Sequence, residues 1–149
     1  MSVNLFDSEF KYDEDDPAGY HPGYRRIGPL VGGERLGLSV YELPPGQSIC
    51  PYHYEVGDEE WLIVLAGRPT LRTPEGEFEL GPWDTVCFPE GPDGAHKLTN
   101  RTQETLQLAL LSTKREPSVA IYPDSNKIGV WPPGKMFRLD DAVEYFEGE

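Results

Sequence analysis

Residues 46–67 read GQSICPYHYEVGDEEWLIVLAG, a stretch that places a histidine and several carboxylates between two glycines. His53 precedes Glu55 by two residues, Glu60 begins a short apolar run, and His96 follows a proline- and glycine-rich turn later in the chain. Imidazole and carboxylate groups are common protein ligands of divalent transition metals. The spacing therefore predicts a metal site in which an all-β chain brings His53, Glu55, Glu60 and His96 together.

The sequence around this stretch is a series of short, strand-like runs. Residues 36–43 carry apolar side chains at every second position, and a Pro-Pro-Gly turn ends that run. Residues 73–76 read Thr-Pro-Glu-Gly, which predicts a tight hairpin. Further strands are expected at 48–55, 60–66, 69–73, 77–80, 84–88, 95–100, 105–111 and 126–131. With only one plausible helical turn, at 139–146, the pattern predicts an all-β sandwich or barrel.

Strand alternation assigns faces to the candidate site residues. If residues 48–55 form one regular strand, His53 and Glu55 share a face, while Cys50 faces the other way. Glu60 and His96 lie on the apolar faces of their own strands. Cys87 also falls on the opposite parity to its strand's inward residues. The alternation therefore predicts that both cysteines are packing residues outside the cavity that the histidines and glutamates share.

Composition limits the classes of function. The chain has 149 residues, enough for one domain, and a formal net charge of −13. Such a charge disfavours nucleic acid and anionic membranes, which are bound through lysine and arginine. The two cysteines have no Cys-x-x-Cys spacing, and the first residues show neither a basic nor an apolar leader pattern. We expect a cytoplasmic protein with reduced thiols.

The ends of the chain differ from its centre. Residues 1–24 are acidic and broken by proline and glycine, and residues 115–149 contain one strand candidate and few core-like runs. We therefore expect an N-terminal arm over 1–24, a barrel over 25–114 and a C-terminal arm over 115–149. The arms are expected to pack on the barrel or on a partner subunit, which makes a homodimer the expected assembly.

The central residues resemble the two motifs of the cupin superfamily. Gly46, His53, Glu60 and Gly67 follow the first motif, with Glu55 where the family has a second histidine. Residues 89–91, His96 and Asn100 are similar to the second motif. Trp83 stands in place of the glycine that begins this motif, and the turn before His96 is enlarged. The resemblance implies a double-stranded β-helix, or jelly-roll barrel, with extended terminal arms. It also implies that His53, Glu60 and His96 are ligands of a divalent metal such as Fe, Mn, Zn or Ni.

Glu55 leaves two interpretations open. A carboxylate can replace the family's histidine and shift the preference toward harder ions. Alternatively the metal site has decayed, and Glu55 is solvated or paired with a basic residue. The corresponding functions are a metal-dependent oxygenase, isomerase or lyase acting on a small organic molecule, a non-catalytic module that binds a sugar or an anion, or a structural dimer with a vestigial site.

Overall fold

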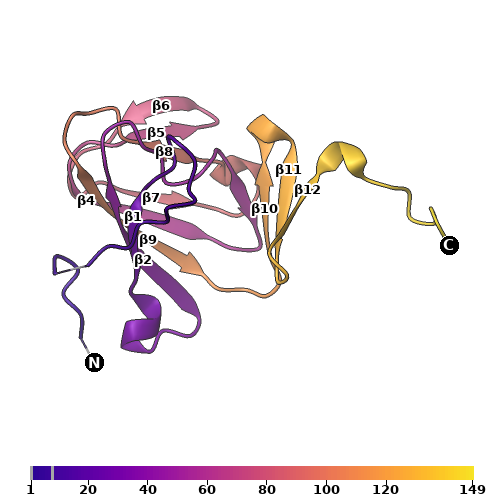
Figure 1. Ribbon diagram of the computed structural model, residues 1–149, viewed down its shortest axis with the longest axis horizontal. Coiled ribbons are helices and arrows are strands. Elements are labelled where there is room, and N and C mark those ends of the chain that lie inside the picture. Colours follow the sequence, from indigo (N-terminus) through magenta and orange to yellow (C-terminus); the bar gives the residue numbers. More distant parts are fainter. Residues whose placement is uncertain (1, 8) are drawn as a thin grey trace.

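The computed structural model describes residues 2–7 and 9–149, and the fold is built from short β-strands (Figure 1). Four single-turn 3-10 helices accompany the strands in the described part of the chain. The strands are β1 (Gly23–Arg26), β2 (Leu36–Leu43), β3 (Tyr54–Val56), β4 (Glu60–Ala66), β5 (Thr70–Thr73), β6 (Gly76–Glu79), β7 (Thr85–Phe88), β8 (Lys97–Thr99), β9 (Leu106–Thr113), β10 (Ser118–Tyr122), β11 (Lys127–Trp131) and β12 (Lys135–Arg138). The helices are η1 (Gly28–Val31), η2 (Pro92–Gly94), η3 (Pro123–Ser125) and η4 (Leu139–Asp141).

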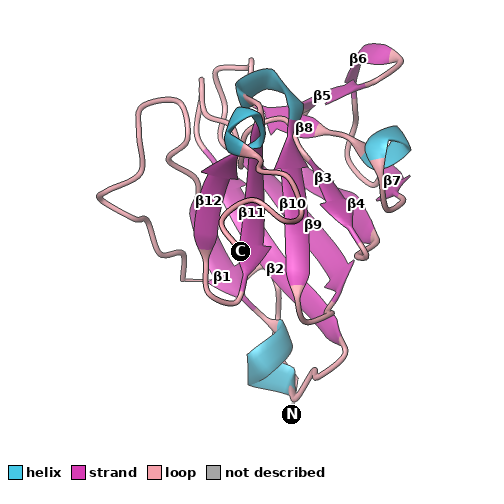
Figure 2. Ribbon diagram, turned by 90° about the vertical axis from the view of Figure 1, so that its right-hand side faces the viewer, coloured by secondary structure: helices cyan, strands magenta, loops and turns pink. Residues whose placement is uncertain are grey.

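The strands form three sheets that follow a jelly-roll arrangement. The five-stranded sheet has the order β1-β2-β9-β4-β7, the four-stranded sheet β12-β11-β10-β3 and the three-stranded sheet β6-β5-β8. Figure 2 shows the strands β10, β11 and β12 in front of β2 and β9. The sheets do not close into one hydrogen-bonded barrel. Isolated bridges join segments between them, one from Ser48 to Thr99 and one from His53 to His96.

The core lies where the inward faces of the sheets meet. Its fully buried side chains alternate along the strands as the apolar pattern predicts, with Leu62 and Val64 of β4 inside and Trp61 exposed. Gly67 ends β4 with a positive φ of 85°, and a Cβ there would overlap Leu106. The glycine is therefore required both by the turn and by the close approach of β9. The core cluster consists of Leu43, Leu62, Val64, Leu71, Phe88, Leu98, Leu106 and Leu108.

Most predicted strands are confirmed. The predictions at 36–43 and 60–66 agree with β2 and β4 at both ends, and 73–76 forms the expected hairpin between β5 and β6. Asn100 is fully buried and fixes the turn after β8, because its amide donates to the carbonyls of Leu43 at 2.8 Å and Glu104 at 2.7 Å. This side-chain to backbone bonding is the role that the sequence predicts for Asn100.

Two predicted elements are wrong. The strand expected at 48–55 is irregular up to His53, and only Tyr54–Val56 forms a strand in this region. Pro51 interrupts it, since proline offers no N–H for a ladder and fixes its own φ. The helical turn expected at 139–146 is limited to the three residues of η4.

The C-terminal segment contributes strands to a shared sheet. β10 pairs with β3 of the central region, so that Ala120 lies opposite Glu55 and Ile121 opposite Tyr54. Beyond η4 the chain extends away from the body of the molecule (Figure 1). None of the described helices is long and apolar enough to cross a bilayer.

Candidate metal centre

His53 and His96 face each other through a backbone bridge. The amide of His53 donates to the carbonyl of His96 at 3.1 Å, and the amide of His96 donates back at 2.8 Å. The ring centroids lie 4.7 Å apart, and both residues are buried. Residues separated by more than forty positions thus form one pair inside the fold. The bridge fixes the two imidazoles relative to each other.

Backbone carbonyls fix the tautomer of each imidazole. The Nδ1 of His53 lies 3.0 Å from the carbonyl oxygen of Pro51, and the Nδ1 of His96 lies 2.9 Å from that of Gly94. A carbonyl oxygen can only accept, so each Nδ1 carries the proton and donates. Each Nε2 is left with its lone pair directed into the site. Metal-binding histidines are commonly oriented by a second-shell bond of this kind.

Glu60 lies between the two imidazoles. Its Oε2 is 3.5 Å from Nε2 of His96 and 3.8 Å from Nε2 of His53. The ligand atoms of His53, Glu60 and His96 all lie within 4.8 Å of one another, a grouping able to hold a metal ion. Glu60 is the first residue of β4, where the predicted inward face places it.

Glu55 borders this group from β3. Its Oε1 is 3.5 Å from Nε2 of His53, while its Oε2 is buried without a hydrogen-bond partner, as is Oε2 of Glu60. Among the residues that the structure describes, no lysine or arginine lies within 4.0 Å of either carboxylate. The alternative in which Glu55 pairs with a basic residue is therefore not found in the described part of the chain, and the two acids lack a basic counter-charge there.

Burial shifts the pKa of every group in the site toward its neutral form. It raises the pKa of Glu55 to about 8, with added repulsion from Glu60 and Asp58, and that of Glu60 to about 7, with added repulsion from Asp58. Burial, together with the neighbouring His53, lowers the pKa of His96 to about 4. The pKa of His53 is also lowered, mainly by burial. Neutral imidazoles beside uncompensated carboxylates form a donor set that a divalent transition metal fits.

Aromatic rings hold both imidazoles in place. The ring of Phe88 stacks on His96 with a centroid distance of 3.7 Å, and the ring of Tyr122 stacks on His53 at 5.7 Å. Burial raises the pKa of Tyr122 to about 12, with Cys50, Glu55 and Glu60 adding to the shift. No sequence pattern points to Tyr122, because only the pairing of β10 with β3 brings it to the site.

The prediction for Cys50 is wrong. Its Sγ lies 3.5 Å from Nδ1 of His53, and the residue lines a cavity with His53 and His96. The irregular chain before β3 breaks the alternation on which the prediction rested. Burial raises the pKa of its thiol, as do Glu60 and Glu55. Cys87 lies outside the site as predicted, but it is exposed rather than packed.

Two cavities open onto the ligand group. The larger cavity, of about 780 Å³, contains Glu55 and Glu60 and is bordered by the acids Glu34, Asp58 and Glu116 together with Lys114 and Arg115. The smaller cavity, of about 350 Å³, reaches His53, Glu60 and His96 and is bordered by Arg26, Ser39 and Tyr41. Glu60 and Ser112 line both. Burial raises the pKa of Tyr41 to about 12, with Cys50 and Glu60 adding to it, whereas Ser39 and Arg26 act in the opposite direction.

A jelly roll that carries imidazoles and carboxylates on its inner face defines a class of small-molecule-acting β-barrel proteins. The family profile described as Cupin domain matches residues 39–113, half of the 149-residue chain. The chain belongs to the cupin family. The matched range includes both motifs that the sequence analysis singled out. A comparison with curated proteins gave no match.

Solved structures with the same fold cover nearly the whole chain. A candidate sugar phosphate isomerase from Acidithiobacillus ferrooxidans is similar with a TM-score of 0.83 and 23% identity, covering 94% of this chain and 91% of its own. A sugar phosphate isomerase of the cupin superfamily from Silicibacter pomeroyi has a TM-score of 0.84 and 22% identity, covering 97% and 96%. The polyketide cyclase RemF from Streptomyces resistomycificus has a TM-score of 0.63 and 24% identity, covering 79% and 82%. At sequence identities of 22–24%, the similarity to these structures shows a shared fold and no more.

Proposed function

We propose that this chain is a metal-dependent cupin enzyme that holds a divalent transition metal, Fe, Mn, Zn or Ni. His53, Glu60 and His96 would be the principal ligands, and Glu55 a fourth, peripheral one. The observation that carries the proposal is the convergence of two Nε2 lone pairs on buried carboxylate oxygens that have no hydrogen-bond partner. Leaving these charges uncompensated in a buried site would be costly. A bound cation removes that cost.

The surrounding side chains are suited to a small organic substrate. A bound metal ion would polarise a carbonyl or hydroxyl oxygen of that substrate. Tyr41 lines the smaller cavity and keeps its proton at neutral pH, because its pKa is raised to about 12, so it can donate a hydrogen bond. Glu55 borders the larger cavity, and in the metal-free protein its pKa of about 8 lets it exchange a proton near neutrality.

Among the reaction types open to this fold, we place isomerisation ahead of oxygenation and lyase chemistry. Two of the similar structures that span nearly the whole chain are named for sugar phosphate isomerisation. Moving a proton between adjacent carbons requires a metal-polarised oxygen and a nearby proton acceptor. The smaller cavity, of about 350 Å³, is in the range typical of small-molecule sites.

Elemental analysis of protein purified without chelator tests the metal. We expect close to one ion per chain, lost in His96→Ala; no metal even after reconstitution would sink the proposal. The metal-loaded protein is then incubated in D₂O with a panel of aldose and ketose phosphates. Deuterium uptake next to the carbonyl, absent from metal-free protein, would support isomerisation. A metal-bound protein with no turnover on any substrate would favour a ligand-binding module instead.

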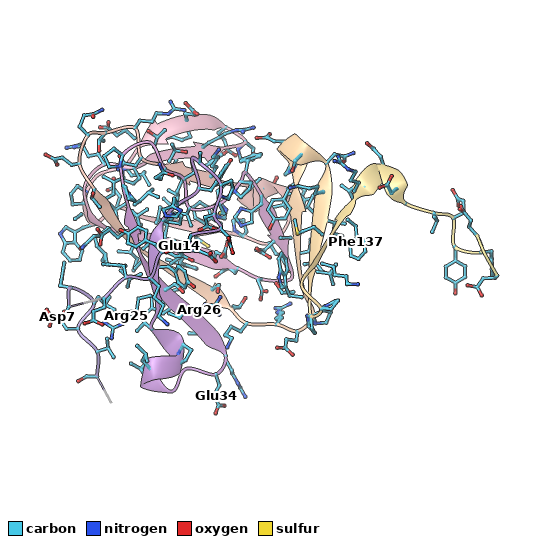
Figure 3. The ribbon with its side chains drawn as sticks, viewed as in Figure 1. Asp7, Glu14, Arg25, Arg26, Glu34 and Phe137 are labelled. Carbon is cyan, nitrogen blue, oxygen red and sulfur yellow. The ribbon has the colours of Figure 1, made fainter. Side chains whose placement is uncertain are left out.

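We also propose a cytoplasmic homodimer formed through the C-terminal segment. Phe137 lies on β12 (Figure 3) and is 51% exposed. It borders an apolar cavity of about 580 Å³ with Ile128, Leu139 and Val143. The tail beyond η4 carries Tyr145 and Phe146, both exposed. A second copy could cover both surfaces reciprocally across a two-fold axis. Light scattering at micromolar concentration should give a dimer mass, and truncation after residue 141 should give a monomer.

A further inference from the structure

We propose that the smaller cavity is a subsite for a phosphate-class anionic group of the substrate, with Arg26 as its principal ligand. The inference rests on the proposed function, because it assigns a substrate class to the same site. Arg26 is the last residue of β1 and lies at the rim of this cavity, which extends inward to His53, Glu60 and His96. A substrate held there would have one end at Arg26 and the other at the ligand group.

Strand register places Arg26 on the same face of the sheet as Glu60, in a row displaced by two residues along the strands. Arg26 lies opposite Ser39 on β2, Gly37 of β2 lies opposite Ser112 on β9, and Ser112 lies opposite Glu60 on β4. All five residues line the smaller cavity. β1 and β4 are three strand spacings apart in the sheet, about 14 Å along its surface. An extended arginine covers part of this distance, and a substrate several carbon atoms long covers the rest.

The two cavities differ in the charged residues that line them. Arg26 is the one lysine or arginine among the described residues that line the smaller cavity, and no described carboxylate lies within 4.0 Å of its guanidinium. Asp16 also lies at this rim. The larger cavity, by contrast, carries five acidic residues against Lys114 and Arg115. In a chain with a net charge of −13, the smaller cavity, lined by Arg26 together with Asp16 and Glu60, is the less acidic of the two and therefore the more favourable for an anionic group.

Two hydroxyl groups that line the smaller cavity favour a tetrahedral oxyanion over a carboxylate. Ser39 lies opposite Arg26 and its hydroxyl hydrogen-bonds Tyr41, whereas Ser112 lies on β9 opposite Glu60. Each can turn an O–H donor toward a ligand, and the guanidinium offers a planar fork of N–H donors. A phosphate has oxygens enough to accept from all three, whereas a carboxylate has two. Gly37 keeps this space open, because a Cβ there would lie 2.9 Å from Oγ of Ser112. The glycine thus leaves the hydroxyl free to turn toward a ligand.

Inorganic phosphate is the probe, titrated calorimetrically into metal-free full-length protein at constant ionic strength. Omitting the metal prevents phosphate from binding at the ligand group itself. Arg26→Gln should weaken phosphate binding at least about tenfold, since a charge-assisted hydrogen bond is lost. Arg25→Gln is the matched control: it removes the same charge one residue away, from a side chain that instead donates to the carbonyl of Asp7 at 3.0 Å (Figure 3). It should bind phosphate within about twofold of the wild type.

The outcomes separate the inference from the proposed function. Equal weakening by Arg26→Gln and Arg25→Gln, or no measurable phosphate binding by the wild type, would overturn the subsite whether or not metal is bound. Acetate binding as tightly as phosphate would overturn its phosphate class. Ser39→Ala tests the hydroxyl without a change in charge and should weaken phosphate more than acetate. Phosphate binding that depends on Arg26, in a protein that never takes up metal, would leave the subsite standing and remove the enzyme proposal.

Discussion

The two cavities that meet at Glu60 differ in charge and in origin. The larger cavity is acidic, and its wall includes Ser118 and Trp131 from the C-terminal strands. The smaller cavity carries Arg26 and Tyr41 from β1 and β2. The ligand group thus lies between a strongly acidic cavity and a less acidic cavity that Arg26 lines together with Asp16 and Glu60. The difference suggests that metal and substrate reach the same centre from different sides.

Glu60→Gln, at the junction of the cavities, should have the largest effect. Glu60 is the one carboxylate within 4.0 Å of both imidazole Nε2 atoms among the described residues, so we expect metal affinity to fall at least about 100-fold. Competition with a chromophoric chelator measures the change. Glu59→Gln is the control, because Glu59 is exposed and its carboxylate accepts from Nε1 of Trp61 instead. Equal losses in the two variants would mean that the effect is general electrostatics rather than ligation.

Glu55→Gln should weaken metal binding less than Glu60→Gln does, and its effect should be confined to the larger cavity. Glu55 contacts only the imidazole of His53 within the ligand group, so we expect metal affinity to fall about tenfold, less than for Glu60→Gln. Phosphate binding in the smaller cavity should stay unchanged. Glu116→Gln removes a charge from the rim of the same cavity and serves as the control. A loss as large as that of Glu60→Gln would make Glu55 a principal ligand.

The metal-free protein should lose stability as pH rises from 6.5 to 8. Glu55 and Glu60 have folded pKa values of about 8 and 7, above the ordinary value of 4.5, so the folded state binds more protons in this window and stability falls. His96 acts in the opposite direction only between about pH 4 and 6.5. We expect a loss on the order of 1 kcal/mol by urea denaturation. Bound metal should abolish it, and a rise in stability over this window would contradict the shifts.

Sequence reasoning succeeded where local patterns decide the structure. The limits of β2 and β4, the hairpin at 73–76 and the bonding of Asn100 all follow from alternation and turn chemistry. The grouping of His53, Glu60 and His96 required the motif spacing in addition. The prediction that Cys50 faces away from the site failed because Pro51 makes the chain irregular and breaks the strand alternation. Tyr122 could not be found, since its position depends on strand pairing across more than sixty residues, for which the sequence carries no local signal.

Tyr122 offers the smallest and most discriminating test of how the C-terminal strands support the centre. Its ring stacks on His53 at an interplanar angle of 20°, and such contacts are worth about 0.5–1.5 kcal/mol. Tyr122→Leu should therefore weaken metal binding about threefold. Tyr122→Phe keeps the ring and should match the wild type in the same chelator competition. If Tyr122→Phe were as weak as Tyr122→Leu, the hydroxyl rather than the stacked ring would be the group that supports His53. The C-terminal sheet would then act on the site through a hydrogen bond.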